Sequence, residues 1–147
     1  QRQEHAVIAL IDIDHFKTIN DTFGHVVGDC VLRQLSAELR RSLREGDQAG
    51  RYGGDEFCVI LPEISEAQVC QVMERLRERV SSYRNPQLPH LRISLSIGLS
   101  PFEANLESPE HWLEQADKAL YIAKHAGRDQ VNFARSEAAA LRLAYSD

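Results

Sequence analysis

The sequence predicts an α+β fold built on a split βαβ unit, β-α-β-β-α-β, with an antiparallel-rich sheet and helices covering one face. Three observations predict it: an apolar run near the N-terminus, two strand-like segments around a glycine pair, and helical apolar spacing on either side of that pair. The 147 residues, 43% of them apolar, suffice for one domain with its own core and leave no room for a second.

The first half of the chain is predicted to contain a central strand and two helices. Residues 6–13 are almost continuously apolar, as in a strand buried on both faces. A short helix over 15–23 follows, which Gly24 ends in a left-handed conformation. The next helix carries apolar residues at three- and four-residue spacing and ends near Gly46.

A tight hairpin is predicted in the middle of the chain. The strand-like segments QAGRY and DEFCVIL are separated only by Gly53 and Gly54, and a two-glycine connection suits a primed turn. Ser65 and Gln68 then form a capping box that opens a further helix.

The last third is predicted to hold two strands around one helix. Residues 91–99 alternate apolar and polar, so one face of that strand is expected in the core and the other outside it. Ser108 caps a helix that has Pro109 at its first position, and Gly127 ends it. QVNFA forms the last strand, so the domain covers residues 1–134, and 135–147 form a helical tail.

Composition excludes several function classes. The formal net charge of −5 disfavours nucleic acid as a partner. The three cysteines form no metal-binding or disulfide pattern, which favours reduced thiols and a cytoplasmic location. No apolar run is long enough to span a membrane, so this domain is expected to make no membrane contact, although a longer parent chain could be anchored.

Four acids are expected to gather at one edge of the sheet. Asp12 and Asp14 end the first strand, while Asp55 and Glu56 follow the glycine pair, and these two places are neighbours in a split βαβ sheet. Any one of them alone would more often be a solvated turn residue. Together they would repel one another without a cation, and oxygen ligands favour Mg²⁺. Because side chains alternate along a strand, either Asp55 or Glu56 should be the principal ligand.

Three segments resemble the hallmark motifs of the GGDEF diguanylate cyclase family: RYGGDEF at 51–57, DIDHFKTINDTFGHVVGD at 12–29 and ADKALYIAKHAGRDQV at 116–131. The resemblance implies a ferredoxin-like or palm-like fold with the GGDEF hairpin at the active-site edge. It also implies condensation of two GTP molecules into cyclic di-GMP and two pyrophosphates, at the interface of a homodimer. Two Mg²⁺ ions per active site would be the cofactor, with Mn²⁺ as a possible substitute. Family members ordinarily have a DxLTGLxNRR-like segment before the first strand, which residues 1–134 lack.

The resemblance also assigns roles to individual residues. The metal would be bound by the carboxylate of Asp12, the backbone carbonyl of Ile13 and the acids Asp55 and Glu56. Asp55 would in addition be the base for the attacking 3′-hydroxyl, with Glu56 in a supporting role. The remaining substrate-binding residues would be Phe16, Lys17, Asn20, His25, Asp29, Gly53, Gly54, Lys124 and Arg128.

These assignments agree with the residue types. A carboxylate such as Asp29 can accept hydrogen bonds from guanine N1 and N2, a pairing that adenine cannot offer. Amides around Phe16 and Lys17 at a helix start suit phosphate. Lys124 and Arg128, four residues apart, are expected on one face of the last helix. Asp129 stands where the family usually has Asn, and we expect a small effect near the phosphates.

An inhibitory product site is also implied. Arg44 and Asp47 form an RxxD motif five residues before the glycine pair, with Arg75 on the next helix as a third contact. Alone, the motif would suit a helix C-terminus followed by a turn. The alternative to a working cyclase is a catalytically silent module that binds GTP or cyclic di-GMP.

Overall fold

The computed structural model describes residues 5–103 and 106–134, so the predicted tail at 135–147 lies outside the described residues. The elements in chain order are β1 (Val7–Ile13), α1 (Phe16–Phe23), α2 (His25–Ser42), β2 (Gln48–Arg51), β3 (Glu56–Leu61), α3 (Glu66–Ser81), β4 (Leu95–Pro101), α4 (Pro109–His125) and β5 (Gln130–Phe133). None of the helices among these residues is long and apolar enough to cross a membrane.

Strand β1 lies at the centre of a five-stranded sheet with the order β2-β3-β1-β4-β5. It pairs antiparallel with both β3 and β4, and only the β4/β5 pair is parallel. This order confirms the predicted split βαβ unit. Every residue of β1 is buried, as its continuous apolar sequence predicts.

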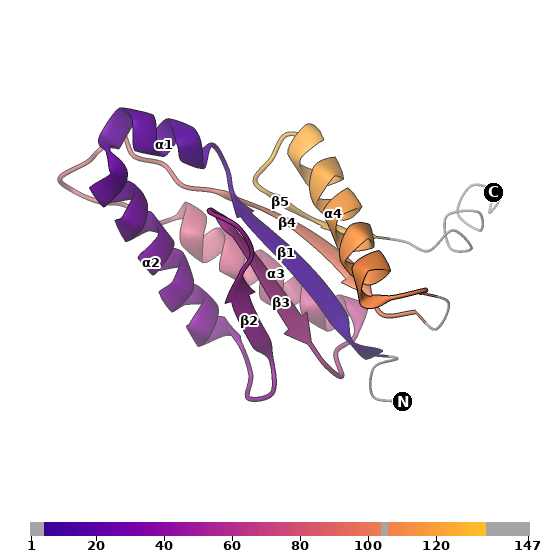
Figure 1. The fold of residues 1–147 in the computed structure, drawn as a ribbon. Coiled ribbons are helices and arrows are strands. Elements are labelled where there is room, and N and C mark those ends of the chain that lie inside the picture. Colours follow the sequence, from indigo (N-terminus) through magenta and orange to yellow (C-terminus); the bar gives the residue numbers. More distant parts are fainter. Residues whose placement is uncertain (1–4, 104–105, 135–147) are drawn as a thin grey trace, which may run out of the picture.

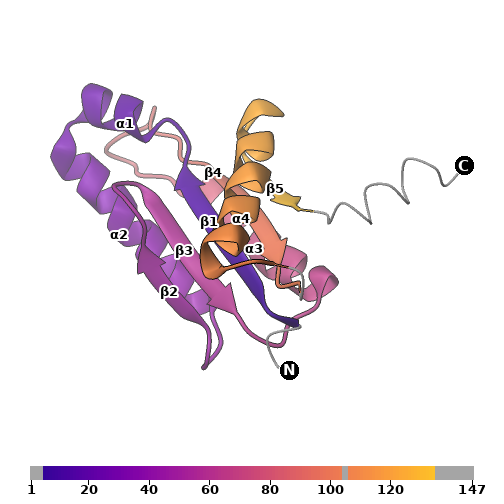
Figure 2. The same cartoon turned by 45° about the vertical axis from the view of Figure 1, so that its right-hand side comes forward.

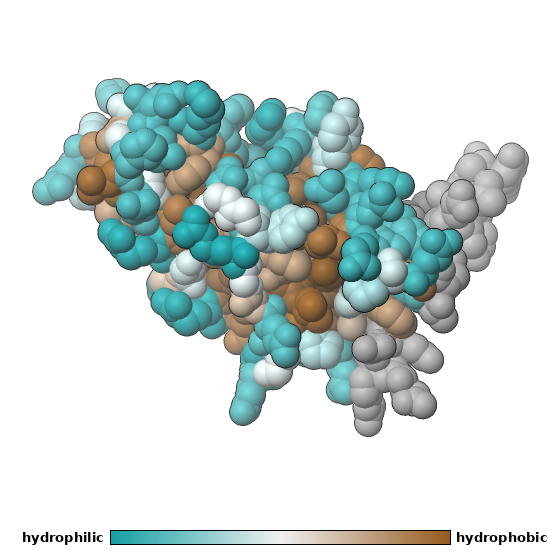
Figure 3. All heavy atoms as spheres, in the orientation of Figure 1, coloured by the Kyte–Doolittle hydropathy of each residue, from teal (hydrophilic) through white to brown (hydrophobic). Residues whose placement is uncertain are grey.

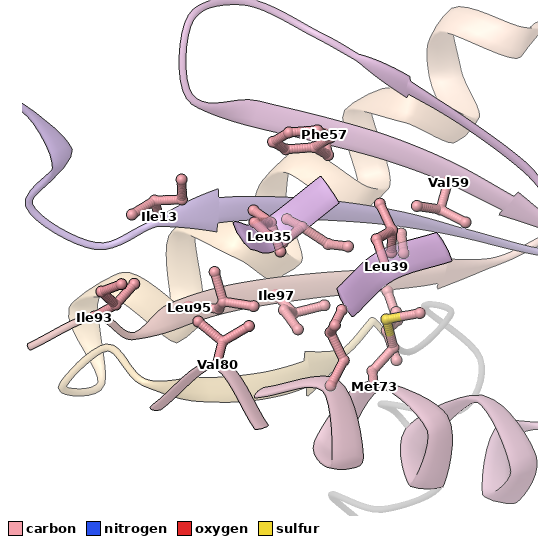
Figure 4. Close-up of a cluster of buried hydrophobic side chains, with 14 of the residues drawn as sticks. Ile13, Leu35, Leu39, Phe57, Val59, Met73, Val80, Ile93, Leu95 and Ile97 are labelled. Atoms are coloured by element: carbon pink, nitrogen blue, oxygen red, sulfur yellow. The ribbon is translucent and has the colours of Figure 1, made fainter. Parts of the chain in front are cut away.

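The main core lies between the sheet and helices α2 and α3. Alternate side chains of β1, β3 and β4 point to this side, where they meet the apolar stripes of the two helices (Figure 4). Met73, Leu76 and Leu35 are among its fully buried members. The spacing predicted from the sequence therefore places the correct faces of α2 and α3 on the sheet.

Helix α4 covers the opposite face, which corrects the expectation that helices cover one face only. Figures 1 and 2 show α4 on one side of the sheet and α2 and α3 on the other. Ala116 and Leu120 of α4 pack there against Ile8 and Leu10 of β1. The hairpin extends beyond this cover, and Figure 3 shows apolar surface between it and α4. Ile60 of β3 is 36% exposed.

The core face of β4 is as predicted, with Leu95, Ile97 and Leu99 in the main core, but the opposite face is not outside it. Ser96, Gly98 and Ser100 were expected outside the core but are buried. Small residues are needed here because α4 approaches closely: a Cβ on Gly98 would lie 2.3 Å from the backbone nitrogen of Leu120. The strand begins at Leu95, later than the alternation predicts.

Element boundaries follow local signals with small shifts. Ser65 and Gln68 form the predicted capping box, and Ser108 caps α4 with Pro109 at its start. Gly24 separates α1 from α2 at φ 93° and ψ 163°, which is a positive φ but not the predicted left-handed helical conformation. Helix α2 ends at Ser42, before the glycine that was expected to end it.

The hairpin connection is longer than the glycine pair. Strand β2 ends one residue earlier than predicted, at Arg51, and β3 begins one residue later, at Glu56. The Tyr52 N–H donates to the Glu56 carbonyl at 2.7 Å, across the connection. Of the two glycines only Gly53 has a positive φ, 94°, so the turn is not the primed type in which both central residues require one.

Candidate active site

Three of the four acids predicted to meet, Asp12, Asp55 and Glu56, do so at the end of β1. Asp12 lies directly opposite Glu56 in the β1/β3 register, and the Ile13 N–H donates to the Asp55 carbonyl at 3.4 Å. Asp55 is close enough to Asp12 for its charge to raise the pKa of Asp12. The geometry that the sequence predicts for these acids is therefore present.

Burial and like charge make this cluster electrostatically unfavourable on its own. Burial, reinforced by the charge of Asp55, raises the pKa of Asp12 from 3.8 to about 7, although Lys124 opposes the shift. Burial also raises the pKa of Glu56, with contributions from Asp55 and Asp117 against the opposing charge of Lys124. The acids thus favour any additional positive charge.

One cation of the protein already neutralises part of this charge. The Lys124 ammonium, on α4, forms an ion pair with Asp12 Oδ2. Its pKa is raised although burial alone would lower it, because Asp12, Glu56 and Asp55 favour its charged form. Lys124 is therefore a counter-charge to the acids, a role that the sequence analysis did not assign to it.

Two buried oxygens at the site have no hydrogen-bond partner. In the part of the chain that the structure describes, Asp12 Oδ1 and Asn20 Oδ1 are the two buried side-chain polar atoms of this kind. Buried polar groups are normally satisfied, and exceptions call for an explanation such as an ion or a ligand. Both belong to residues that the sequence predicts to bind metal or substrate.

The residues at this edge fit a divalent cation. An unpartnered carboxylate oxygen beside further acids is the all-oxygen environment that Mg²⁺ prefers. Within residues 5–103 and 106–134, no group of three or more acidic, histidine or cysteine side chains is already placed to bind a metal ion. The predicted set also uses the carbonyl of Ile13, which lies between Asp12 and the start of α1.

Asp14 does not join the other acids as expected. Its carboxylate accepts hydrogen bonds from Ser94 Oγ and Ser96 Oγ, both at 2.6 Å, and from the Asp129 N–H at 3.0 Å. With three donors it is a structural group.

The predicted phosphate-binding amides do lie at a helix start. Phe16 and Lys17 are the first two residues of α1, and no side chain caps the N-terminal end of this helix. The preceding His15 has φ 56° and ψ 37°. The first amides of a helix have no partner within it, so they remain available to an anion.

The predicted guanine-binding residues lie on α1 and α2. Asn20 packs closely against Gly28, where a Cβ would lie 1.8 Å from Asn20 Oδ1. His25 and Asp29 are exposed on the first turns of α2. Asp29 lines a small cleft of about 170 Å³ that reaches Arg51.

Lys124 and Arg128 are not on one helix face, which corrects that prediction. Helix α4 ends at His125, and Arg128 lies in the following connection with a left-handed φ of 63°. Asp129, expected near the phosphates, instead pairs with Arg77 of α3 at 2.8 Å.

Arg44 and Asp47 of the predicted inhibitory site bind each other. Arg44 Nη2 lies 2.9 Å from Asp47 Oδ1, and the Arg44 N–H donates to Asp47 Oδ2 at 2.8 Å. Arg75 is exposed on α3, and no hydrogen bond or ion pair among the described residues joins it to this pair.

Asp117 also acts on the site, although no role was predicted for it, because its charge contributes to the raised pKa of Glu56. A signal was available, because Asp117 and Lys124 are seven residues apart and therefore lie on the same face of α4. A cleft of about 470 Å³ lies beside α1 and is lined by Asp14, Ile93 and Asp129 among others. It contains none of the acids that gather at the end of β1.

Several known proteins resemble this chain in sequence. Residues 1–130 match the family model described as "Diguanylate cyclase, GGDEF domain". The chain is 41% identical over 129 residues to the probable diguanylate cyclase DgcC of Escherichia coli, covering 88% of this chain and 35% of that protein. It is 46% identical over 130 residues to the diguanylate cyclase DgcP of Pseudomonas aeruginosa, covering 87% and 19%. The chain thus spans about a third or less of the length of these two relatives.

Solved structures resemble the fold as well. The GGDEF domain of DgcB from Caulobacter crescentus, in complex with c-di-GMP, gives a TM-score of 0.82 at 36% identity, covering 89% of this chain and 78% of that one. The active GGEEF domain of a diguanylate cyclase from Vibrio cholerae gives 0.85 at 30% identity, covering 92% and 86%.

Proposed function

The chain belongs to the diguanylate cyclase GGDEF-domain family, and from that premise we propose that it condenses two GTP molecules into cyclic di-GMP and two pyrophosphates. The observation that carries the proposal is the unpartnered buried oxygen of Asp12 beside Asp55 and Glu56. These acids need a cation, and a triphosphate brings one with it.

In this proposal the metal would be held by Asp12, the carbonyl of Ile13, Asp55 and Glu56. Bound there, Mg²⁺, or Mn²⁺ in its place, would offset the negative charge on the attacking and departing oxygens. The sequence family implies two such ions.

The protein's own residues would bind and orient the substrate. The amides at the start of α1, together with Lys124 and Arg128, would hold the phosphates, while Asn20, His25 and Asp29 would select guanine. Gly53 and Gly54 would let the nucleotide approach the hairpin.

The bond changes require two domains. The 3′-oxygen of one GTP bonds to the α-phosphorus of the other, the bond to the bridging oxygen of the pyrophosphate breaks, and the hydroxyl proton passes to Asp55. One such edge holds one GTP, so we propose that two copies of the domain face each other in a homodimer. The reaction then occurs twice and closes the ring.

The experiment is pyrophosphate release from GTP and Mg²⁺ in a cytoplasm-like reducing buffer. Wild-type protein should release two pyrophosphates per cyclic di-GMP, while Asp55→Ala should be inactive. Glu78→Gln, an exposed change on α3, should keep wild-type turnover. Omission of divalent cations should abolish release. GTP binding without turnover in a dimeric protein would support the silent binding module instead.

A further inference from the structure

Asp14 connects three segments at the edge of the sheet. It directly follows β1. Its two carboxylate oxygens accept from the hydroxyls of Ser94, just before β4, and Ser96 of β4, and Oδ2 also accepts the Asp129 N–H from the α4/β5 connection. The side chain is buried, with 5% of the residue exposed. Charge-assisted hydrogen bonds of this kind are among the stronger ones in proteins.

Asp129 extends the connection to α3. Its Oδ1 accepts from Arg77 Nη1 at 2.8 Å, and Arg77 Nε also donates to Glu74 at 2.8 Å. The Arg77 side chain is only 18% exposed. Burial lowers the pKa of Arg77, but its hydrogen bonds to Asp129 and Glu74 outweigh that effect and raise it.

The segment held in this way has an unusual backbone. Arg128 and Asp129 have φ values of 63° and 51°, in the left-handed region that side chains other than glycine seldom adopt. Such conformations persist where surrounding contacts hold them. Two hydrogen bonds hold the Arg128 backbone, from its N–H to the Ala123 carbonyl at 3.0 Å and from Gln130 Nε2 to its carbonyl at 2.9 Å. Asp129 is held by the Asp14 bond to its backbone and the Arg77 bond to its side chain.

The contacts tie together two elements that would bind phosphate. Asp14 lies two residues before the first amide of α1, and Asp129 follows Arg128 directly. We propose that Asp14, Asp129 and Arg77 are positioning residues that fix the Arg128 segment relative to the start of α1. The inference rests on the proposed function, because the position of Arg128 affects the reaction only if Arg128 binds the triphosphate.

The matched test compares two arginines of the same helix. Arg77→Met removes the partner of Asp129, whereas Arg79→Met makes the same change at an exposed arginine of α3. We expect Arg77→Met to raise KM for GTP about threefold to fivefold with little change in kcat, and Arg79→Met to change neither. Arg77→Lys should recover part of the effect because it keeps the charge. Equal KM values for Arg77→Met and Arg79→Met would overturn the proposal.

A double-mutant cycle separates positioning from general stability. If Arg77 acts through Arg128, then Arg77→Met should have little effect on KM once Arg128→Ala is present. Effects that multiply would show that Arg77 acts elsewhere and would overturn the inference. If Arg128→Ala alone leaves KM unchanged, the proposed phosphate role of Arg128 is wrong. Wild-type protein without turnover would instead contradict the proposed cyclase.

Hydrogen exchange provides a readout that does not depend on activity. In nucleotide-free protein the Asp129 amide should exchange roughly tenfold faster in Asp14→Asn than in wild type, because a neutral amide is a weaker acceptor than a carboxylate. Arg77→Met should speed exchange in residues 127–129 without affecting α2. Wild-type protection of this amide in both variants would overturn the proposal, whatever the cyclase assay shows.

Discussion

Asp12 and Asp14 are both buried carboxylates at the end of β1, but their surroundings are opposite. Asp14 accepts three hydrogen bonds. Asp12 has one oxygen without a partner, an acidic neighbour in Asp55, and Lys124 as its counter-charge. Ser96 even lies opposite Asp12 in the β1/β4 register, yet its hydroxyl donates to Asp14.

The difference shows how one strand end can serve both structure and chemistry. A carboxylate whose two oxygens both have donors contributes to the fold, whereas one with an oxygen left without a donor remains available to a ligand. Residues two apart on a strand point to the same side, so the sequence position alone does not separate the two roles. The two roles are separated by the partners that β4 and the hairpin provide.

The largest expected effect is on turnover when Asp12 is changed. Asp12→Asn should lower kcat roughly 10³-fold, because a principal oxygen ligand next to the reacting phosphate becomes neutral. The free energy of unfolding should stay equal or rise, since repulsion from Asp55 and Glu56 is relieved. Pyrophosphate release and urea unfolding measure the two quantities. Near-normal turnover of Asp12→Asn, or a large loss of its stability, would contradict the contrast between a ligand-binding Asp12 and a structural Asp14.

Changing Asp14 should have the reverse profile. Asp14→Ala should lower the free energy of unfolding by about 3 kcal/mol, because it leaves the buried Ser96 hydroxyl, the half-buried Ser94 hydroxyl and a backbone N–H without their acceptor. Asp21→Ala, an exposed change on α1, should stay within about 0.5 kcal/mol of wild type. Urea unfolding of the three proteins provides the comparison. If Asp14→Ala were as stable as Asp21→Ala, Asp14 could not be a structural group.

The raised pKa of Asp12 predicts a pH dependence of stability. Between the unfolded value of 3.8 and the folded value of about 7, the folded state keeps a proton that the unfolded state has released. The associated stability is complete below pH 3.8 and is lost as the pH rises through about 7. In this window the slope should approach about 1.4 kcal/mol per pH unit.

Urea unfolding in EDTA from pH 4.5 to 8 measures this slope. Subtracting the curve of Asp12→Asn removes contributions from other groups, and the difference should fall with pH and level off above about 7. Parallel curves for the two proteins would mean that Asp12 ionises normally despite its burial.

Much of the fold followed from the sequence because its signals are local. The apolar run of β1, the capping box at Ser65 and the glycine pair each specify a nearby element, and the pairing of β1 with β3 then brings Asp12 to the hairpin. The position of α4 did not follow. Ser96, Gly98 and Ser100 suggest a solvent-facing side, yet they are small because a helix packs closely there.

The functional site was predictable in its acids but not in their partners. The motif places Asp12, Asp55 and Glu56 together, as the register confirms. The donors of Asp14 come from residues at sequence separations of 80 to 115, and no periodicity indicates them. Helix α4 ends at His125, so Arg128 lies outside it. The four-residue spacing of Lys124 and Arg128 did not predict this boundary.

The smallest predicted loss of stability concerns the Arg44–Asp47 pair. Asp47 resembles Asp14 because its carboxylate has hydrogen-bond donors within the protein. Its side chain is 1% exposed and paired with Arg44, whose own side chain is 47% exposed. Arg44→Ala should therefore lower the free energy of unfolding by no more than about 1 kcal/mol. If the pair is also the predicted inhibitory site, the same variant should need at least about tenfold more cyclic di-GMP for half-inhibition, because a charge-assisted contact to phosphate is lost. Arg40→Ala, at an exposed arginine of α2, should retain wild-type inhibition. Weakened folding with unchanged inhibition would place Asp47 with Asp14, as a carboxylate that binds other parts of the protein and no ligand.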